Sequence, residues 1–371
     1  MVFLLYLLYP LSLLYQVIFY FNQKRKQPIR LTMDLIISVG NLSVGGTGKT
    51  PFTIHLTKLI NSIYTNSEVT ILSRGYGSKL SNSGAVVELH SSADEVGDEP
   101  FLIKQELREA EVIIGSNRVL SFHRFSRHAN KSPDSKILTN KKDYKSILIL
   151  DDGFQHLAIA RDIDIVLVDG RKPIENGLTL PIGRLRETEK SLVRANVLIF
   201  TRCRFANGRI HYDSNWEKRI LRKFPHLSIF HAQESKLGYY NKKVWMDLRK
   251  LENEYKYGHK FLEGKRVFAF CGLASPSSFF KSIQDENPGE LECKQYKDHY
   301  NFPESELENL FQKLEHYDIL ICTEKDFVKI YSRIKPEYEN KIFFLKIESS
   351  ILELEQWTSF WKNVLDSKIV K

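Results

Sequence analysis

The chain has 371 residues, of which 42% are hydrophobic and 27% charged, and its formal net charge is +9. This composition is typical of a globular protein long enough for two domains, and it excludes a largely disordered chain. The positive charge suits an anionic partner or serves solubility alone. The sequence has no basic stripe interleaved with aromatic residues, so we expect no nucleic-acid partner. Its four cysteines form no C-x-x-C pair, which argues against a zinc site and a disulfide framework.

The chain opens with an apolar segment. From residue 2 to residue 21 only a proline, a serine and a glutamine interrupt a run of Leu, Val, Ile, Phe and Tyr, and basic residues follow at 24–26. About 20 apolar residues can just span a hydrocarbon core, whereas tyrosines and a proline suit a helix lying in the interface. No positive segment precedes the run and no A-x-A-like site ends it, which disfavours a cleaved signal peptide. A buried core helix is the other alternative. We predict that residues 1–28 form a membrane-associated helix, with the basic residues among cytoplasmic headgroups.

Apolar strands alternate with helical segments from residue 29 onward, which predicts an α/β fold with a parallel sheet wrapped by helices. The predicted strands cover residues 35–39, 69–72, 111–114, 146–150, 164–168, 195–201, 266–270, 317–322 and 341–347. Helices are predicted over residues 51–60, 100–109 and 276–283. Residues 129–145 read as a solvated insertion or loop. We predict a core over residues 29–235, an inter-lobe connection over 236–265 and a smaller C-terminal α/β lobe over 266–371.

A glycine-rich segment lies between the first predicted strand and the first predicted helix of this core. It reads Ser43-Val44-Gly45-Gly46-Thr47-Gly48-Lys49-Thr50. A phosphate-binding loop requires this context, because small residues let backbone N–H groups approach phosphate oxygens and the helix N-terminus adds a positive dipole end. In that role Lys49 reaches the β- and γ-phosphates of a nucleotide, and the Thr50 hydroxyl ligates Mg²⁺. The usual pattern opens with glycine, whereas this segment opens with Ser43. A merely structural turn is the alternative.

Two carboxylates follow the predicted strand at 146–150. Asp151 and Asp152 therefore lie at the carboxyl end of an apolar strand, where parallel sheets bind their ligands. Mg²⁺ prefers oxygen ligands and keeps several waters, so we expect one carboxylate to bind it directly and the other through water. The alternative is a polar turn, since Asp-Asp-Gly is good turn sequence. Beside the phosphate-binding loop, the pair predicts a magnesium site.

These motifs together resemble the tetraacyldisaccharide 4'-kinase family, the lipid A 4'-kinases of Gram-negative bacteria. The matching segments are SVGNLSVGGTGKTP at 38–51, LSRGYG at 72–77, GDEP at 97–100, DDGFQH at 151–156, LPIGRLRE at 180–187, GLA at 272–274, DHY at 298–300 and TEKD at 323–326. The DDGFQH string is particularly specific. A loop that opens with serine and an apolar N-terminal segment also fit this family, whereas residues 129–145 and 240–265 are less family-like.

The resemblance implies that the γ-phosphoryl group of ATP is transferred, with Mg²⁺, to the 4'-hydroxyl of a tetraacylated glucosamine disaccharide 1-phosphate, giving the bis-phosphorylated lipid A precursor. It also implies a two-lobed, P-loop NTPase-like fold with its active site between the lobes. The expected location is the cytoplasmic face of the bacterial inner membrane, without an obligate protein partner.

By the same resemblance Asp98 is the base that takes the hydroxyl proton. His299 from the other lobe assists it, and Asp298 orients the imidazole. The alternatives are a helix N-cap for Asp98 and a surface residue for His299.

Further candidate substrate-binding residues are Arg74, Arg118, Arg186 and Glu187. Arginines suit the substrate's 1-phosphate or the charge that develops in the transition state, because guanidinium groups form bidentate hydrogen bonds. Structural salt bridges are the alternative for these residues.

Two other functions compete with a lipid kinase. A GTPase would carry a guanine-reading N-K-x-D segment, and residues 140–143 have that spelling, but no apolar strand leads into them. A membrane-bound nucleotide sensor or scaffold would have no need of a base–histidine pair across two lobes.

Overall fold

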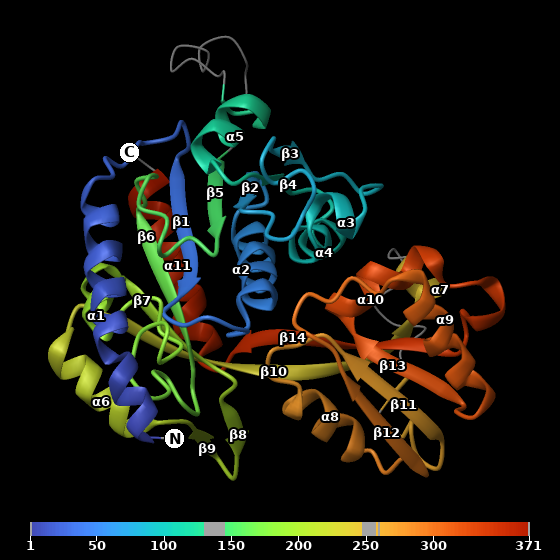
Figure 1. The fold of residues 1–371 in the computed structure, drawn as a ribbon. Coiled ribbons are helices and arrows are strands. Elements are labelled where there is room, and N and C mark those ends of the chain that lie inside the picture. Colours follow the sequence, from blue (N-terminus) through green and yellow to red (C-terminus); the bar gives the residue numbers. More distant parts are fainter. Residues whose placement is uncertain (1, 130–144, 247–256, 259, 370–371) are drawn as a thin grey trace.

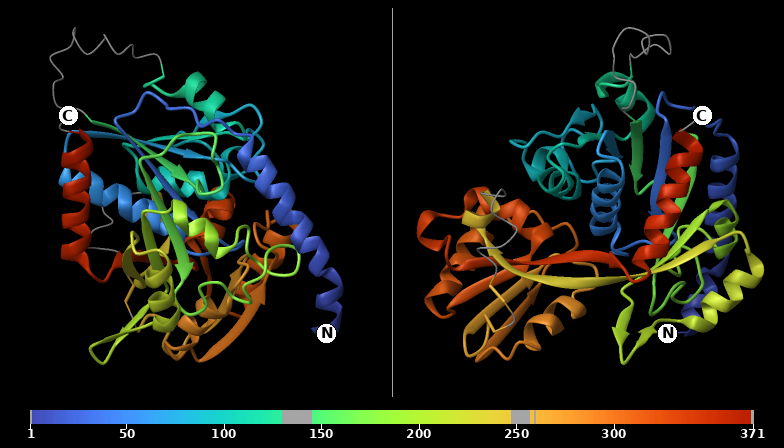
Figure 2. Two further views of the ribbon diagram at one scale, coloured as in Figure 1. Left: turned by 90° about the vertical axis from the view of Figure 1, so that its left-hand side faces the viewer. Right: turned by 180° about the vertical axis from the view of Figure 1, so that it is seen from behind.

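The computed structural model describes residues 2–129, 145–246, 257–258 and 260–369. Within these ranges the chain forms two lobes that share one mixed sheet (Figures 1 and 2). The insertion predicted at 129–145 lies almost wholly outside the described residues, as does part of the predicted inter-lobe connection. The expected α/β class with a mostly parallel sheet is confirmed.

Twelve strands of the described chain form this sheet. In sheet order they are β12 (Glu290–Gln295), β11 (Arg266–Cys271), β13 (Ile319–Thr323), β14 (Ile342–Ile351), β10 (Ser228–Asn241), β7 (Val197–Thr201), β6 (Ile163–Asp169), β1 (Leu35–Asn41), β5 (Lys145–Asp151), β2 (Ser67–Ser73), β4 (Glu111–Ile114) and β3 (Ala85–Val86). Neighbours are parallel except for two antiparallel pairs, β10 with β14 and β3 with β4. A separate hairpin joins β8 (Arg204–Ala206) to β9 (Arg209–His211).

Helices cover both faces of the sheet, which is why its central strands are almost wholly apolar. Successive side chains of β1 point to opposite faces: Ile37 packs in the core cluster that contains Phe52, whereas Ile36 packs in the cluster that contains Phe122. The helices are α1 (Val2–Lys24), α2 (Lys49–Ile63), α3 (Ala93–Val96), α4 (Asp98–Glu106), α5 (Arg118–Phe125), α6 (Ser214–Lys223), α7 (Lys242–Met246), α8 (Ser277–Gln284), α9 (Glu304–Gln312), α10 (Glu324–Ile330) and α11 (Leu354–Ile369).

The two lobes are joined by the long strands β10 and β14. The first residues of β10, 228–231, pair with β7 of the core, and its later residues, 232–241, pair with β14. The predicted boundary at 235/236 therefore falls inside a strand. The last helix also departs from the predicted division, because α11 packs on the core: Trp357 contacts Phe52 and Phe230, and the Tyr64 hydroxyl donates to Asp366 at 2.7 Å.

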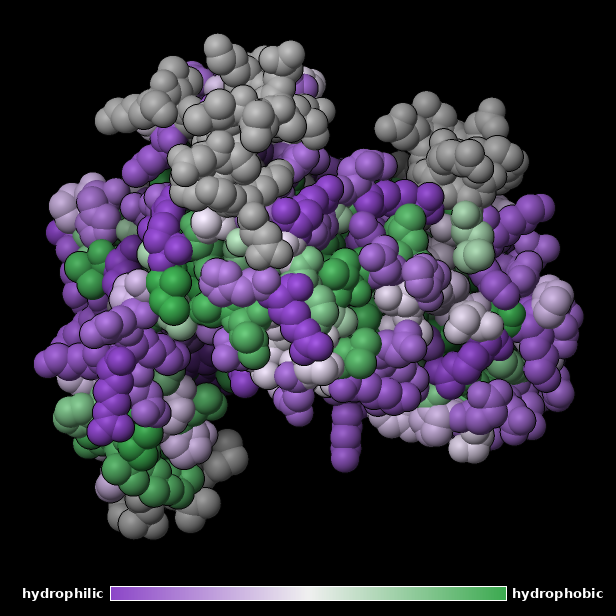
Figure 3. All heavy atoms as spheres, turned by 90° about the horizontal axis from the view of Figure 1, so that it is seen from above, coloured by the Kyte–Doolittle hydropathy of each residue, from purple (hydrophilic) through white to green (hydrophobic). Residues whose placement is uncertain are grey.

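The N-terminal helix α1 has two different faces. Its polar side chains bind loops of the core: Ser12 contacts the carbonyl and hydroxyl of Thr179, and the Tyr15 hydroxyl donates to the Arg186 carbonyl at 3.1 Å. Large apolar side chains between residues 8 and 21 are exposed instead, and they are Leu8, Tyr9, Leu11, Leu13, Leu14, Val17, Ile18, Tyr20 and Phe21. Figure 3 shows this apolar surface projecting from the body of the molecule. Among the described residues, none of the helices has the length and apolarity needed to cross a bilayer.

Candidate active site

The glycine-rich segment forms the turn between β1 and α2. Gly45 has φ +109° and Gly48 has φ +77°, values that favour glycine, and a Cβ at Gly45 would lie 2.2 Å from the Arg184 guanidinium. The Asn41 amide donates to the Thr47 hydroxyl at 2.9 Å and ties the loop to the end of β1. The first N–H groups of α2 have no acceptor within the helix, so this turn has the form of an anion-binding site.

Lys49, the first residue of α2, points toward the carboxylates that follow β5. Its Nζ lies 3.6 Å from Asp152, and Arg186 binds both oxygens of the same carboxylate at 2.8 and 3.0 Å. Burial raises the pKa of Asp152, but the charges of Lys49 and Arg186 outweigh this effect and lower that pKa to about 2. Asp152 is therefore ionised, and it sits at a positive φ of 48°.

Asp151 is more deeply buried than its neighbour. It accepts hydrogen bonds from Ser73 at 3.1 Å and from Thr53 at 3.4 Å. Burial and the negative charges of Glu99 and Asp152 raise its pKa to about 6. A divalent cation would reverse this effect by favouring the charged carboxylate.

The oxygen donors fit Mg²⁺ rather than a soft metal. Thr50 is the second residue of α2, and Asp151 and Asp152 end the neighbouring strand, so hydroxyl and carboxylate oxygens come from two adjacent elements. Mg²⁺ is commonly held by one or two carboxylates together with substrate phosphates. A set of three or more His, Cys, Asp or Glu side chains suited to a metal does not occur in the described part of the chain.

The four candidate substrate residues lie in different surroundings. Arg118 is buried, and its guanidinium donates to the carbonyls of Asp151 and Asp152 at 2.6 and 3.1 Å. Glu187 is also buried and pairs with Arg194 at 2.9 Å. Arg74 is exposed, and Arg186 pairs with Asp152. Arg118 and Glu187 thus have structural partners, whereas Arg74 is open to a ligand.

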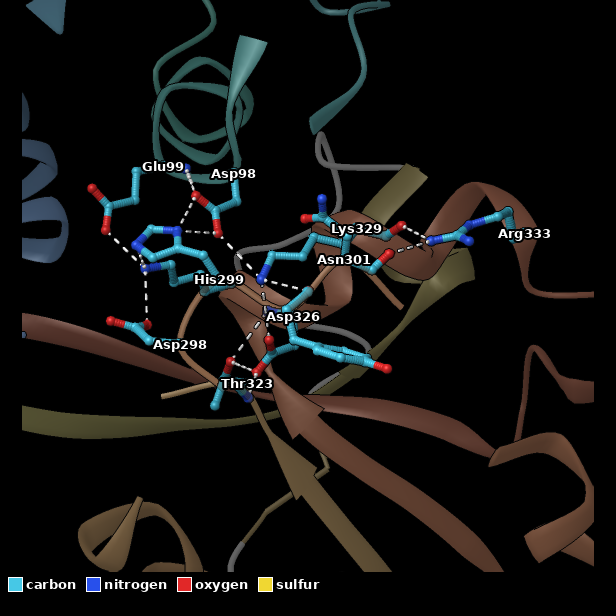
Figure 4. Close-up of polar contacts among 12 residues, drawn as sticks. Asp98, Glu99, Asp298, His299, Asn301, Thr323, Asp326, Lys329 and Arg333 are labelled. Atoms are coloured by element: carbon cyan, nitrogen blue, oxygen red, sulfur yellow. Dashed lines mark hydrogen bonds and ion pairs between the residues drawn. The ribbon is translucent and has the colours of Figure 1, made fainter. Parts of the chain in front are cut away.

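A second polar cluster forms where α4 of the core meets the C-terminal lobe (Figure 4). Asp98 is the first residue of α4, follows Gly97 and is 6% exposed. Its carboxylate lies 3.1 Å from Nδ1 of His299 and 3.2 Å from Nζ of Lys329. Burial raises the pKa of Asp98, but the His299 hydrogen bond and the charges of Lys325 and Lys329 outweigh it and hold that pKa well below its usual range.

The structure brings Asp98 and His299 together, 201 positions apart in sequence, but gives Asp298 a different contact. Asp298 lies 3.8 Å from Lys325, and Lys325 lies 3.2 Å from Nε2 of His299. Nδ1 of His299 therefore faces Asp98 and Nε2 faces Lys325, whereas Asp298 was predicted to orient the ring. His299 itself has φ +58°, a strained conformation for a residue with a side chain.

Lys325 and Lys329 are functional candidates that the sequence reasoning did not select. They lie one helical turn apart on α10, with Asp326 between them. Asp326 is fully buried and accepts hydrogen bonds from the Gly272 N–H at 2.9 Å and the Thr323 hydroxyl at 2.6 Å, which fixes the helix start. The sequence did contain a signal for Lys325, because this residue lies in the TEKD segment that matches the family, but no role was assigned to its side chain.

A phosphate-binding loop followed by a lysine, and a buried carboxylate paired with a histidine from a second lobe, define a nucleotide-dependent kinase of the P-loop class. The family model for tetraacyldisaccharide-1-P 4'-kinase matches residues 4–366. The chain belongs to this tetraacyldisaccharide 4'-kinase family.

Individual relatives support this family assignment. The tetraacyldisaccharide 4'-kinase of Leptospira biflexa is 33% identical over 97% of this chain and 95% of its own length. The enzyme of the same name from Pelobacter propionicus is 32% identical over 98% of this chain and 93% of its own. Among solved structures, LpxK from Aquifex aeolicus in complex with ATP matches with a TM-score of 0.66 and 25% identity, covering 97% of this chain and 99% of that one.

Proposed function

We propose that this protein transfers the γ-phosphoryl group of ATP to the 4'-hydroxyl of a tetraacylated glucosamine disaccharide 1-phosphate. The observation that carries this proposal is the 3.1 Å contact between Asp98 and His299, which unites a carboxylate of the core with a histidine of the second lobe. A sugar hydroxyl must lose a proton during phosphoryl transfer, whereas a sensor needs no such pair. The names of the relatives supply the acceptor.

Each residue then has a defined task. The glycine-rich loop and Lys49 hold the β- and γ-phosphates. Thr50, Asp151 and Asp152 would hold Mg²⁺, which would neutralise phosphate charge. The 4'-oxygen forms a bond to the γ-phosphorus, the bond from that phosphorus to the bridging oxygen breaks, and ADP leaves. The hydroxyl proton passes to Asp98. Because phosphoryl transfer has a loose transition state, placing these groups matters more than the basicity of the carboxylate.

The exposed apolar face of α1 supports action at a membrane surface. Burial of such side chains in the headgroup boundary is favourable, and the basic residues at 24–26 suit anionic lipids. ATP is a cytoplasmic nucleotide, so we place the enzyme on the cytoplasmic face of the bacterial inner membrane.

The direct test is to incubate the purified chain with γ-labelled ATP and the acylated disaccharide 1-phosphate in mixed micelles. We expect labelled lipid, no labelled lipid with Lys49→Ala, and a kcat reduced roughly a hundredfold or more with Asp98→Asn. An excess of unlabelled ATP, but not of GTP, should suppress the label. Nucleotide binding without labelled lipid would instead favour a sensor, and an Asp98→Asn variant with a raised KM and normal kcat would remove Asp98 from the role of base.

A further inference from the structure

Lys325 of α10 is placed where it controls the protonation of His299. Its Nζ lies 3.2 Å from Nε2 of His299, 2.9 Å from the Glu99 carboxylate and 3.8 Å from Asp298 (Figure 4). The ammonium group thus stands on the side of the imidazole opposite to Asp98. Its side chain is 18% exposed, so solvent screens these contacts only in part.

The hydrogens at this contact can be assigned from the chemistry of the groups. A lysine ammonium has three donors and no acceptor, so Nε2 of His299 must accept from Lys325. A neutral imidazole that accepts at Nε2 carries its proton on Nδ1. Nδ1 faces the two carboxylate oxygens of Asp98 at 3.1 and 3.2 Å, so this N–H donates to Asp98.

Lys325 keeps the proton that this donor role requires. Burial lowers the pKa of Lys325, but the charges of Glu99, Asp98 and Asp298 outweigh it and raise that pKa above its usual range.

We propose that Lys325 is a positioning residue that holds the proton of His299 on Nδ1, so that Nδ1–H orients Asp98 and Asp98 receives the proton of the acceptor hydroxyl. The role of Asp98 in this statement rests on the proposed function. His299 then serves as a hydrogen-bond donor to Asp98, because its other nitrogen is occupied by Lys325. The titratable groups that contact the ring are Tyr76, Asp98 and Lys325. Glu99 and Asp298 contact Lys325, Lys329 contacts Asp98, and Asp326 contacts Lys329.

The proton positions can be read directly by NMR on the full chain with ¹⁵N-labelled histidine, using His299→Gln to identify the signals. We expect the Nδ1–H form of His299 in the parent at neutral pH. In Lys325→Met, Nε2 loses its donor, so we expect a mixture of the Nδ1–H and Nε2–H forms. An Nε2–H form in the parent, or the same distribution of the two forms in both proteins, would overturn the proposal.

Kinetics supply an independent test. In Lys325→Met we expect kcat to fall about tenfold with KM unchanged, because Asp98 is no longer held in place by His299. Lys325→Arg keeps a charged donor and should restore the parental kcat. The matched control is Lys313→Met, which removes an ion pair with Glu292 within the same lobe and should leave kcat unchanged.

A purely structural lysine would lower the melting temperature of Lys325→Met while leaving kcat parental in the folded fraction, which would refute the positioning role. The NMR measurement on the parent needs no lipid, so it remains decisive for His299 even if the acceptor of the phosphoryl group is another molecule. It also remains decisive if Lys325→Met does not fold.

Discussion

At the scale of single residues, the two arginines Arg74 and Arg118 show why residue type alone does not assign a role. Both were predicted to contact substrate. Arg118 is 3% exposed, and its guanidinium donates hydrogen bonds to the carbonyls of Asp151 and Asp152, whereas Arg74 is exposed. By holding these carbonyls, Arg118 fixes the backbone from which Asp151 and Asp152 project.

We expect Arg118→Met to lower stability and Arg74→Met to weaken substrate binding. Arg118→Met leaves two buried carbonyls without donors and should lower the free energy of unfolding by about 3 kcal/mol. Arg74→Met should keep the parental melting temperature and raise KM for the phosphorylated lipid roughly tenfold, the usual size of a lost charge-assisted hydrogen bond. Thermal unfolding and KM, measured on both variants, separate these effects. A normally stable Arg118→Met with a raised KM would make Arg118 a substrate ligand after all.

The sequence could predict those parts of the candidate site that lie in contiguous motifs or in segments that match the family. The glycine-rich loop and the Asp151–Asp152 pair are contiguous in sequence, and the family resemblance supplied Asp98 and His299. The contact of Lys325 with Glu99 could not be predicted, because it joins positions 226 apart and no spacing rule connects them. The partner of Asp298 was missed for the same reason.

At the scale of elements, strands with continuous apolar runs were predicted well. The strand expected at 111–114 is observed as β4 with the same bounds, and that expected at 266–270 is observed as β11 with one more residue. The strand β10 was missed because its middle residues are only partly buried where it passes between the lobes, so polar side chains interrupt its apolar pattern. The strand β12 was missed because it is a largely exposed edge strand.

The start of α11 is held by a buried charge cluster. His231 of β10 lies 2.7 Å from Glu353, which precedes α11, and 3.8 Å from Glu217 of α6. Burial lowers the pKa of His231, but hydrogen bonds and charges from both glutamates outweigh it and raise that pKa to about 9. Its value in the unfolded chain is about 6.5.

This difference makes the contribution of His231 depend on pH. Because the folded-state pKa is the higher one, the stabilisation is fully present below about pH 6.5 and is lost as the pH rises through about 9. We expect His231→Gln to melt well below the parent at pH 6, and the gap in melting temperature to narrow by pH 9.5. A gap that stays constant between these pH values would mean that His231 is not charged in the folded protein.

For α1 the prediction concerns its exposed face. Leu14→Glu combined with Ile18→Glu places two charges on side chains that are 54% and 53% exposed. We expect the partition onto anionic lipid vesicles to fall at least tenfold, because each apolar side chain contributes roughly 1.5 kcal/mol or more when buried. The melting temperature should not change. Leu221→Glu on α6 is the control, and equal vesicle binding by all three proteins would contradict a membrane role for α1.

At the scale of the whole molecule, the candidate catalytic cluster exists only while the lobes hold their present arrangement. Asp98 and Glu99 come from the core, and His299, Lys325 and Lys329 come from the other lobe. Two ion pairs and one hydrogen bond therefore cross between the lobes at one place: the ion pairs join Asp98 to Lys329 and Glu99 to Lys325, and the hydrogen bond joins His299 to Asp98. Any separation of the lobes removes His299 and Lys329 from Asp98 together.

The strands β10 and β14 connect the two lobes. They are paired by hydrogen bonds along their length, unlike a flexible linker, and their register shifts between Lys236 and Gly238, where Gly238 has φ +143°. Bulges concentrate bending and twist, so movement of one lobe past the other should be a torsion centred on this point. The position of Asp98 relative to His299 is therefore set by the twist of one continuous sheet and not by a flexible linker.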